Sequence, residues 1–115
     1  MLRLQSAKDI ERVWREGRSH AHPLAVLITC PRPAEGDRAV PPTRCGFVAG
    51  KKVGSAVARN RAKRLLREAV RSRPETAMLG WDLVFVARPA LAKATLQQAQ
   101  MAVSQLLKRA NVVNL

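Results

Sequence analysis

The side chains that could do chemistry in this chain are mostly cations, and they gather in residues 50–71, a glycine-punctuated turn that leads into a predicted helix. At about 100° per residue, the basic side chains of the helix share one arc. They are Arg59, Lys63, Arg64, Arg67 and Arg71. Its apolar side chains share the opposite arc: Ala58, Ala62, Leu65, Leu66 and Ala69. A cationic stripe held rigid by a buried face suits a regular array of phosphates, and Glu68 is the single anion within it.

The overall charge also indicates a polyanionic partner. Lys and Arg outnumber Asp and Glu by 21 to 8, which gives a formal net charge of +13. This excess exceeds what solubility needs and repels itself in the folded chain, so nucleic acid is the leading partner class. An anionic membrane surface is the weaker alternative, because no segment combines an apolar face, aromatic anchors and a basic face.

Length and segment composition predict one cytoplasmic domain. A chain of 115 residues can bury a single core, so we expect residues 1–115 to form one domain. No run of about 18 apolar residues predicts a membrane span. The first residues lack the apolar core and cleavage site of a signal peptide, so we expect a cytoplasmic protein with no membrane partner.

The acidic residues do not form a recognisable active site. The eight of them are scattered, and none belongs to the D-x-D or D-x-E pairs that hold Mg²⁺. The turn at 50–55 lacks the spacing of a phosphate-binding P-loop. We therefore expect no catalytic residue, no metal site and no cofactor bound by the protein alone, so that any reacting groups belong to a partner.

Two histidines and two cysteines are the remaining candidate ligands: His20, His22, Cys30 and Cys45. Their spacing matches no zinc pattern. Two cysteines do not make a disulfide framework, and the sequence leaves open whether they pair. We expect the cysteines to be small buried residues on neighbouring strands, and the histidines to lie in a surface connection, where they would add to phosphate binding.

Hydrophobic periodicity predicts the elements that must position the basic helix. They are a helix over 7–16, strands over 24–30 and 44–50, an optional short strand at 51–53, the basic helix, a strand over 81–88 and a helix that begins after Thr95. Loops are expected over 31–43 and 74–80. The order α-β-β-(β)-α-β-α predicts an α/β fold, an α+β two-layer sandwich with helices packed on one sheet.

Turn and cap residues place the ends of the predicted helices. Ser6 and Ser55 are expected to cap the first and second helices, and Gly17 is expected to end the first. Thr95 and Gln98 have the spacing of a capping box at the start of the last helix. The apolar stripe of that helix is predicted to contain Leu96, Ala99, Val103, Leu106, Leu107 and Ala110.

The basic segment and its surroundings resemble the protein component of bacterial ribonuclease P. The resemblance is carried by Arg59-Asn60-Arg61 within a longer pattern, K-K-V-G…R-N-R…K-R…R-E, that spans residues 46–69. Asp9-Ile10 with Val13-Trp14 and Gly17 resembles the first helix of the family. Asp82-Leu83-Val84 with Ala87-Arg88-Pro89 resembles its late strand. The resemblance covers nearly the whole chain.

This resemblance implies a fold and a mechanism. The family fold is similar to domain 2 of ribosomal protein S5, with a left-handed βαβ crossover. The implied function is that of a non-catalytic subunit of an endonuclease: the protein binds the catalytic ribonuclease P RNA and the 5′ leader of precursor tRNA. The RNA, with Mg²⁺, hydrolyses the phosphodiester that joins the leader to the tRNA. The resemblance further implies a monomeric protein in a 1:1 complex with the RNA.

The resemblance also implies two groups of contact residues. The first is expected to contact RNA: Lys51, Lys52, Arg59, Asn60, Arg61, Lys63, Arg64 and Arg67. The second is expected at a cleft for the leader: Ile10, Trp14, Ile28, Val48 and Arg88. Ile10, Ile28 and Val48 replace stacking or hydrogen-bonding residues of the family, whereas Trp14 keeps a stacking surface. For Ile10 and Trp14, simple core packing is the alternative.

Two other functions compete with this one. A ribosomal or general RNA-binding protein of similar fold would share the charge but bind many RNAs with similar affinity. A protein nuclease in its own right would cleave precursor tRNA without an RNA subunit, and the sequence offers it no metal-binding acids.

Overall fold

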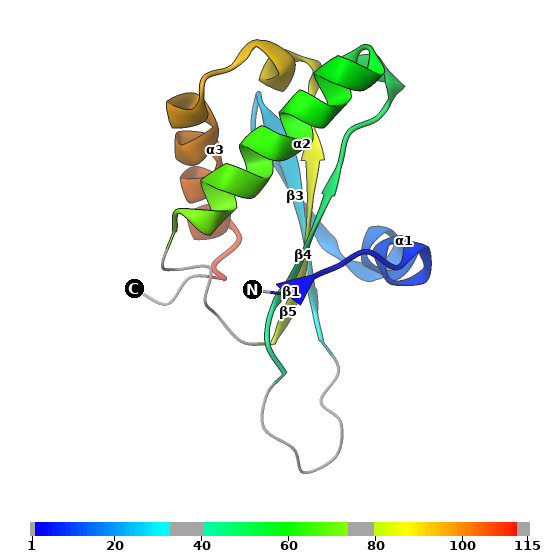
Figure 1. Ribbon diagram of the computed structural model, residues 1–115. Coiled ribbons are helices and arrows are strands. Elements are labelled where there is room, and N and C mark those ends of the chain that lie inside the picture. Colours follow the sequence, from blue (N-terminus) through cyan, green and yellow to red (C-terminus); the bar gives the residue numbers. More distant parts are fainter. Residues whose placement is uncertain (1, 33–40, 74–79, 113–115) are drawn as a thin grey trace.

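The computed structural model describes residues 2–32, 41–73 and 80–112 (Figure 1). The elements are β1 (Leu2–Arg3), α1 (Ala7–Glu16), β2 (Arg18–Ala21), β3 (Ala25–Pro31), β4 (Arg44–Val48), the 3-10 helix η1 (Lys51–Val53), α2 (Ala56–Arg71), β5 (Trp81–Ala87), the 3-10 helix η3 (Pro89–Lys93) and α3 (Leu96–Arg109). Most of the predicted loops at 31–43 and 74–80 lies outside the described residues.

The described strands form one mixed sheet in the order β1-β4-β5-β3-β2. β5 lies in the centre, parallel to β4 and antiparallel to β3. Because β4 and β5 are parallel neighbours, the chain between them must cross over the sheet, and α2 makes this crossover. β1 adds a short parallel edge beside β4, and β2 pairs antiparallel with β3 at the other edge.

The helices cover the two faces of the sheet unequally. α2 and α3 lie on one side and α1 lies on the other (Figure 1). The larger core lies under α2 and α3, and its fully buried side chains include Leu27, Leu66, Phe85, Leu91 and Leu106. A smaller core lies under α1, where Val13 packs with Leu4, Ile28, Cys30 and Val84. The result is the predicted α/β sandwich, and it is consistent with a fold like that of ribosomal protein S5.

The structure adds two strands to the prediction and removes one. β2 escaped prediction because its sequence, Arg-Ser-His-Ala, is polar and mostly exposed on an edge of the sheet. β1 has two residues, too few for a periodic signal. The optional strand at 51–53 is wrong, because these residues form η1 between Gly50 and Gly54, and the positive φ of 137° at Gly54 turns the chain into α2.

The predicted helix boundaries are confirmed. The Ser55 hydroxyl accepts a hydrogen bond from the Ala58 amide at 3.2 Å, and Thr95 and Gln98 form the full capping box. Ser6 caps α1, and Gly17 ends it. Gly17 has a φ of −81°, which any residue can adopt, so its backbone conformation does not require glycine. The lack of space does, because an added Cβ would lie 2.5 Å from the Val13 carbonyl oxygen.

One detail of the α3 stripe is wrong. Leu96 is 42% exposed at the first turn, where the chain enters from η3, and Ala102 takes a place in the core instead. None of the helices in the described part of the chain is both long and apolar enough to span a bilayer.

Candidate nucleic-acid interface

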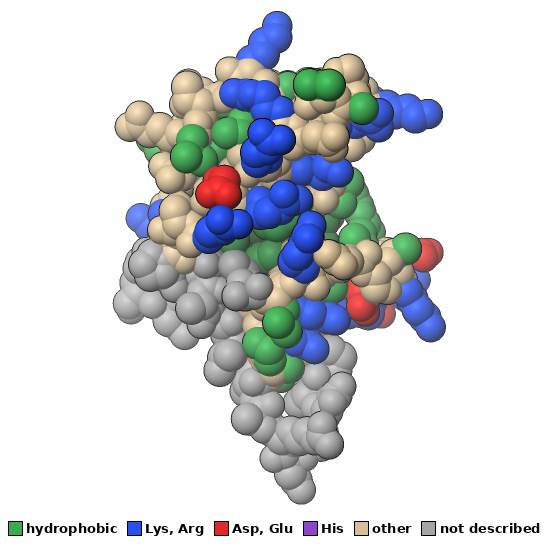
Figure 2. Space-filling view, viewed as in Figure 1, with side chains coloured by type: hydrophobic (Ala, Val, Ile, Leu, Met, Phe, Trp, Pro, Cys, Tyr) green, Lys and Arg blue, Asp and Glu red, His purple; other side chains and the backbone are tan. Residues whose placement is uncertain are grey.

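The predicted cationic stripe is present on α2 and faces away from the larger core. Ala62, Leu66, Ala69 and Val70 are the buried side chains of α2 and fix the helix on the sheet. The opposite side carries the basic residues, which Figure 2 shows gathered over α2. We call Arg59, Asn60, Arg61, Lys63, Arg64 and Arg67 the basic face; Asn60, Arg61 and Arg64 are exposed, and the others are half-buried. Lys51 and Lys52 extend it as exposed residues of η1.

The basic face has little internal compensation. Glu68 is the one acidic residue of α2, and its carboxylate lies 3.3 Å from Arg71, beyond the basic face. This single pair leaves the other cations of α2 without an acidic partner on the same helix. The geometry therefore presents a row of positive charge on a rigid helix, as the sequence predicted.

Arg61 is tied to the neighbouring 3-10 helix. Its guanidinium donates hydrogen bonds to the carbonyl oxygens of Ala92 and Ala94, at 2.6 and 3.0 Å. These carbonyls lie at the end of η3, where a cation is favourable because the last carbonyls of a helical segment lack partners. Arg61 thus has a structural role, docking α2 on η3, that the sequence did not predict.

Arg67 is held by an aromatic ring. Its guanidinium carbon lies 5.8 Å from the centre of the Phe47 ring, and Phe47 stacks on Phe85 with ring centres 5.9 Å apart. This cation–π contact orients Arg67 over β4, at the boundary between α2 and the sheet. The basic face therefore combines exposed cations with cations fixed by packing.

The residues predicted for a leader cleft lie on α1 and on the sheet face beneath it. Trp14 is 52% exposed, which decides against core packing as its sole role. Ile10 and Val48 are partly buried against the smaller core. Ile28 is 3% exposed, so it is covered by the packing of the smaller core and does not line an open surface. Arg88 is exposed just after β5, and its guanidinium lies 3.4 Å from the His22 carbonyl oxygen.

A row of three valines crosses the same sheet face. Val26, Val86 and Val48 are register partners on β3, β5 and β4, and all three are partly buried. The alternation of side chains along β5 places Val86 with Val84, on the α1 side. This valine row is an apolar strip between α1 and the end of the sheet at which β5 leads into Arg88. The sequence analysis predicted only Val48 of the three.

Sequence reasoning missed a cluster of arginines around Asp82. The Asp82 side chain is fully buried on β5, and three guanidiniums surround it. Arg44 binds both carboxylate oxygens, Arg12 from α1 binds Oδ2, and Arg32 lies 3.8 Å from Oδ1. The hydrogen bonds with Asp82 raise the pKa of Arg44. The sequence signal that could have revealed this arginine cluster is the single acidic residue inside the apolar run 81–87.

The two cysteines lie on opposite faces of the sheet. Cys30 on β3 and Cys45 on β4 are buried and are not joined by a disulfide, and β5 separates their strands, so the expectation of neighbouring strands is wrong. They belong to the cores on opposite faces of the sheet. Burial raises the pKa of the Cys45 thiol to about 12. No group of three or more His, Cys, Asp or Glu in the described ranges is placed to hold a metal ion.

The histidines lie near the β2–β3 turn. His20 belongs to β2, where the sequence predicted an irregular connection. His22 lies within the turn, and its Nδ1 accepts a hydrogen bond from the Leu24 amide at 3.0 Å. Both side chains are half-buried, and neither belongs to the basic face.

Comparison with known proteins identifies the family. The family model described as Ribonuclease P matches residues 1–111. The ribonuclease P protein components of Herpetosiphon aurantiacus and Roseiflexus castenholzii are 43% and 42% identical over 110 and 112 residues. These alignments cover 96% of this chain and 85% and 87% of the relatives.

Solved structures agree with the sequence comparison. The RNase P protein of Staphylococcus aureus superposes with a TM-score of 0.80 at 30% identity and covers 99% of both chains. That of Thermotoga maritima gives a TM-score of 0.76 at 26% identity, over 95% of this chain and 97% of the other. The chain therefore belongs to the bacterial ribonuclease P protein family, whose members act in tRNA processing.

Proposed function

We propose that this protein is the non-catalytic subunit of ribonuclease P, which binds the catalytic RNA through α2 and the 5′ leader of precursor tRNA beside α1. The observation that carries the proposal is the basic face, a row of cations without matching acids on a chain of this family. A compact cationic body between two RNAs reduces their mutual repulsion, so it favours assembly of enzyme RNA and substrate.

The leader surface has two parts that suit a single strand. Trp14 offers an exposed ring on which a base can stack, and the valine row offers an apolar floor beside it. Arg88 lies at the end of this floor and supplies a cation for a phosphate. Because Ile28 is covered, we assign the leader contact to Trp14, Ile10, Val48 and Arg88, with Val26 and Val86 added.

The magnesium requirement is assigned to the RNA–protein holoenzyme. Mg²⁺ prefers carboxylate oxygens that are free to coordinate it. The buried carboxylate of Asp82 already accepts hydrogen bonds from Arg12 and Arg44, so this donor set does not fit the ion. We therefore propose that the protein binds no cofactor, that Mg²⁺ belongs to the RNA, and that a monomeric protein joins one RNA in the cytoplasm.

Cleavage of precursor tRNA at low Mg²⁺ tests the proposal, with a bacterial ribonuclease P RNA present or absent. We expect the protein to restore removal of the 5′ leader when the RNA is present, and to cleave nothing alone. Cleavage by the protein alone would show a protein nuclease. Failure to restore cleavage, together with equal affinity for unrelated RNAs, would show a general RNA-binding protein instead.

A further inference from the structure

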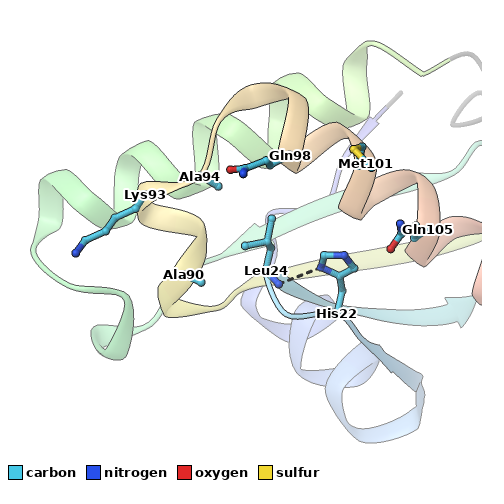
Figure 3. A pocket seen from close by; sticks show the side chains of 8 residues that line it. All are labelled: His22, Leu24, Ala90, Lys93, Ala94, Gln98, Met101 and Gln105. Carbon is cyan, nitrogen blue, oxygen red and sulfur yellow. Dashed lines mark hydrogen bonds between the residues drawn. The ribbon is translucent and has the colours of Figure 1, made fainter.

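We propose that a second site, a pocket where the β2–β3 turn, η3 and α3 meet, accepts one unstacked nucleotide of an RNA strand. The proposal rests on the RNA-binding function proposed above and adds a contact outside the basic face and the valine row. The pocket has a volume of about 270 Å³, a size suited to a small group such as a single base. Figure 3 shows the side chains that line it.

The floor of the pocket is apolar and includes a side chain suited to a base face. Leu24, Ala90 and Ala94 line it from the β2–β3 turn and η3, and Met101 lines it from α3. Met101 is 57% exposed, so its side chain is accessible to a ligand in the pocket. Its polarisable thioether packs well against aromatic rings, so it can contact the face of an inserted base.

The rim supplies hydrogen-bonding groups that match a base edge. His22 Nδ1 accepts the Leu24 amide hydrogen, so the neutral ring carries its proton on Nε2 as a donor. The Gln98 oxygen is engaged with the Thr95 amide at 2.9 Å, which leaves its NH₂ group as a donor. The Gln105 amide adds both a donor and an acceptor. Bases that are not stacked in a helix are recognised by such contacts at their edges.

The charge around the pocket favours a nucleic acid over a protein segment. Residues 83–115 contain no Asp or Glu, so η3 and α3 carry no acidic residue. Lys93 lines the pocket, and the guanidinium of Arg88 lies 3.4 Å from the carbonyl oxygen of His22, a residue that also lines it. Cations beside an apolar floor fit the phosphate and the base of one nucleotide together.

Arg61 links the basic face to a segment that lines the pocket. Arg61 of α2 donates to the carbonyl oxygen of Ala94, and Ala94 lines the pocket. η3 therefore lies between the basic face and the pocket, and an RNA bound along α2 would have to cross only this short segment to reach it. For this reason we assign the pocket to a strand of the same RNA that binds the basic face.

The test follows the ¹³C-labelled methyl group of Met101 by NMR in the full-length protein. The probes are a short single-stranded RNA, a blunt duplex with the same number of phosphates, and bacterial ribonuclease P RNA. We expect the Met101 signal to move saturably with the single strand and with ribonuclease P RNA, and to stay unmoved with the duplex. Equal movement with the duplex would overturn base insertion, because a duplex offers charge but no free base.

A pair of variants separates the pocket from general electrostatics. Met101→Glu and Leu96→Glu both put an acid at an exposed apolar position of α3, but only Met101 lines the pocket. We expect Met101→Glu to weaken binding to ribonuclease P RNA about tenfold, in the range of a lost base contact, and Leu96→Glu to weaken it much less. Equal effects would refute the pocket.

A second pair probes hydrogen bonding at the rim. Gln105→Ala removes a pocket amide, and Gln97→Ala removes an exposed amide of the same helix outside the pocket. We expect only Gln105→Ala to reduce the Met101 shift at a fixed RNA concentration. If the wild-type protein binds the RNA but the Met101 signal does not move and Gln105→Ala has no effect, the pocket proposal fails and the proposed function stands. If it binds no RNA, the proposed function fails as well.

Discussion

Arg44 and Asp82 form a bidentate ion pair across the parallel strands β4 and β5. Arg44 Nε donates to Oδ1 at 2.8 Å, and Nη2 donates to Oδ2 at 2.7 Å. The two residues are direct register partners, so the ladder itself sets this geometry. Arg12 of α1 binds the same carboxylate, and Asp82 therefore joins the sheet to the helix that carries Trp14.

We expect Asp82→Asn to destabilise the fold by about 3–5 kcal/mol, because the arginines around it would lose their buried counter-charge. Urea denaturation measures the loss. Asp9→Asn is the matched control: Asp9 is partly exposed and lies 3.4 Å from Arg44, so we expect less than about 1 kcal/mol. Similar losses in both variants would contradict a central role for Asp82.

We expect Arg64→Ala to weaken binding to ribonuclease P RNA and to reduce the salt dependence of binding by about one unit of slope, as for one lost phosphate contact. Lys108→Ala removes the same charge from α3, outside the basic face, and should leave the slope nearly unchanged. Binding titrations at several salt concentrations measure both. Equal salt-dependence slopes for the two variants would contradict the assignment of α2 to the RNA interface.

Arg61→Ala should differ from Arg64→Ala in its effect on stability. It removes two hydrogen bonds to η3, each contributing about 1 kcal/mol, whereas Arg64 makes no such contact with η3 among the described residues. We expect a lower urea midpoint for Arg61→Ala and an unchanged midpoint for Arg64→Ala. An unchanged midpoint in both would show that the contact with η3 does not hold in solution.

Trp14→Ala should leave the fold intact, because the side chain is 52% exposed. We expect it to weaken binding of precursor tRNA to the holoenzyme about tenfold, the effect of one lost base stack, while binding of mature tRNA changes little. Leu96→Ala removes another exposed apolar side chain and serves as the control. Equal losses for precursor and mature tRNA would place Trp14 outside the leader surface.

Gly17→Ala and Gly50→Ala compare two glycines of similar φ. At Gly17 an added Cβ would lie 2.6 Å from the Ile28 side chain and within 3 Å of two backbone oxygens. At Gly50 nothing lies within 4 Å of it. We expect about 1–3 kcal/mol of destabilisation at Gly17 and little change at Gly50, measured by thermal or urea unfolding.

The buried thiol of Cys45 should be inert in the folded protein. Burial raises its pKa from 9.0 to about 12, which leaves about a thousandfold less thiolate at neutral pH. In a Cys30→Ala background, we expect a thiol reagent to label Cys45 only after denaturation. Labelling of the native protein at the rate of the unfolded chain would contradict its burial.

The same shift predicts a loss of stability at alkaline pH. The folded state favours the neutral thiol, so this contribution is complete below pH 9 and is lost as the pH rises toward 12. Cys45→Ala should flatten the decline of unfolding free energy in that window. A steeper decline of the unfolding free energy in the variant would contradict the predicted direction of the pKa shift of Cys45.

Local signals in the sequence predicted most of the fold. Ser55 and Thr95 fixed the starts of α2 and α3 because capping depends on residues three positions away. β2 could not be predicted, since its polar residues are held by pairing with β3, a contact that no local pattern encodes. Local periodicity also could not show that Cys30 and Cys45 lie on strands that are not neighbours, because β5 enters between these strands from far along the chain.

The candidate site divides in the same way. Helical periodicity placed Arg59, Lys63, Arg64 and Arg67 of the basic face before the fold was known, and the family resemblance added Asn60 and Arg61. The link from Arg61 to η3, the valine row and the Asp82 cluster each join segments distant in sequence. Helical spacing did not assign Ile28 to any site. Family resemblance placed it at the leader surface, and only the tertiary packing under α1 shows that its side chain is covered.

The central position of β5 has a consequence for how the protein is made. β5 is the last strand in the sequence, yet it separates β4 from β3. A nascent chain that ends before Trp81 therefore lacks the middle strand of its sheet and the β5 side chains of both cores. Because β3 and β4 both pair with β5, their pairing cannot be completed before β5 is synthesised. We therefore expect folding to begin only when most of the chain has left the ribosome, and contacts between distant residues to set its rate.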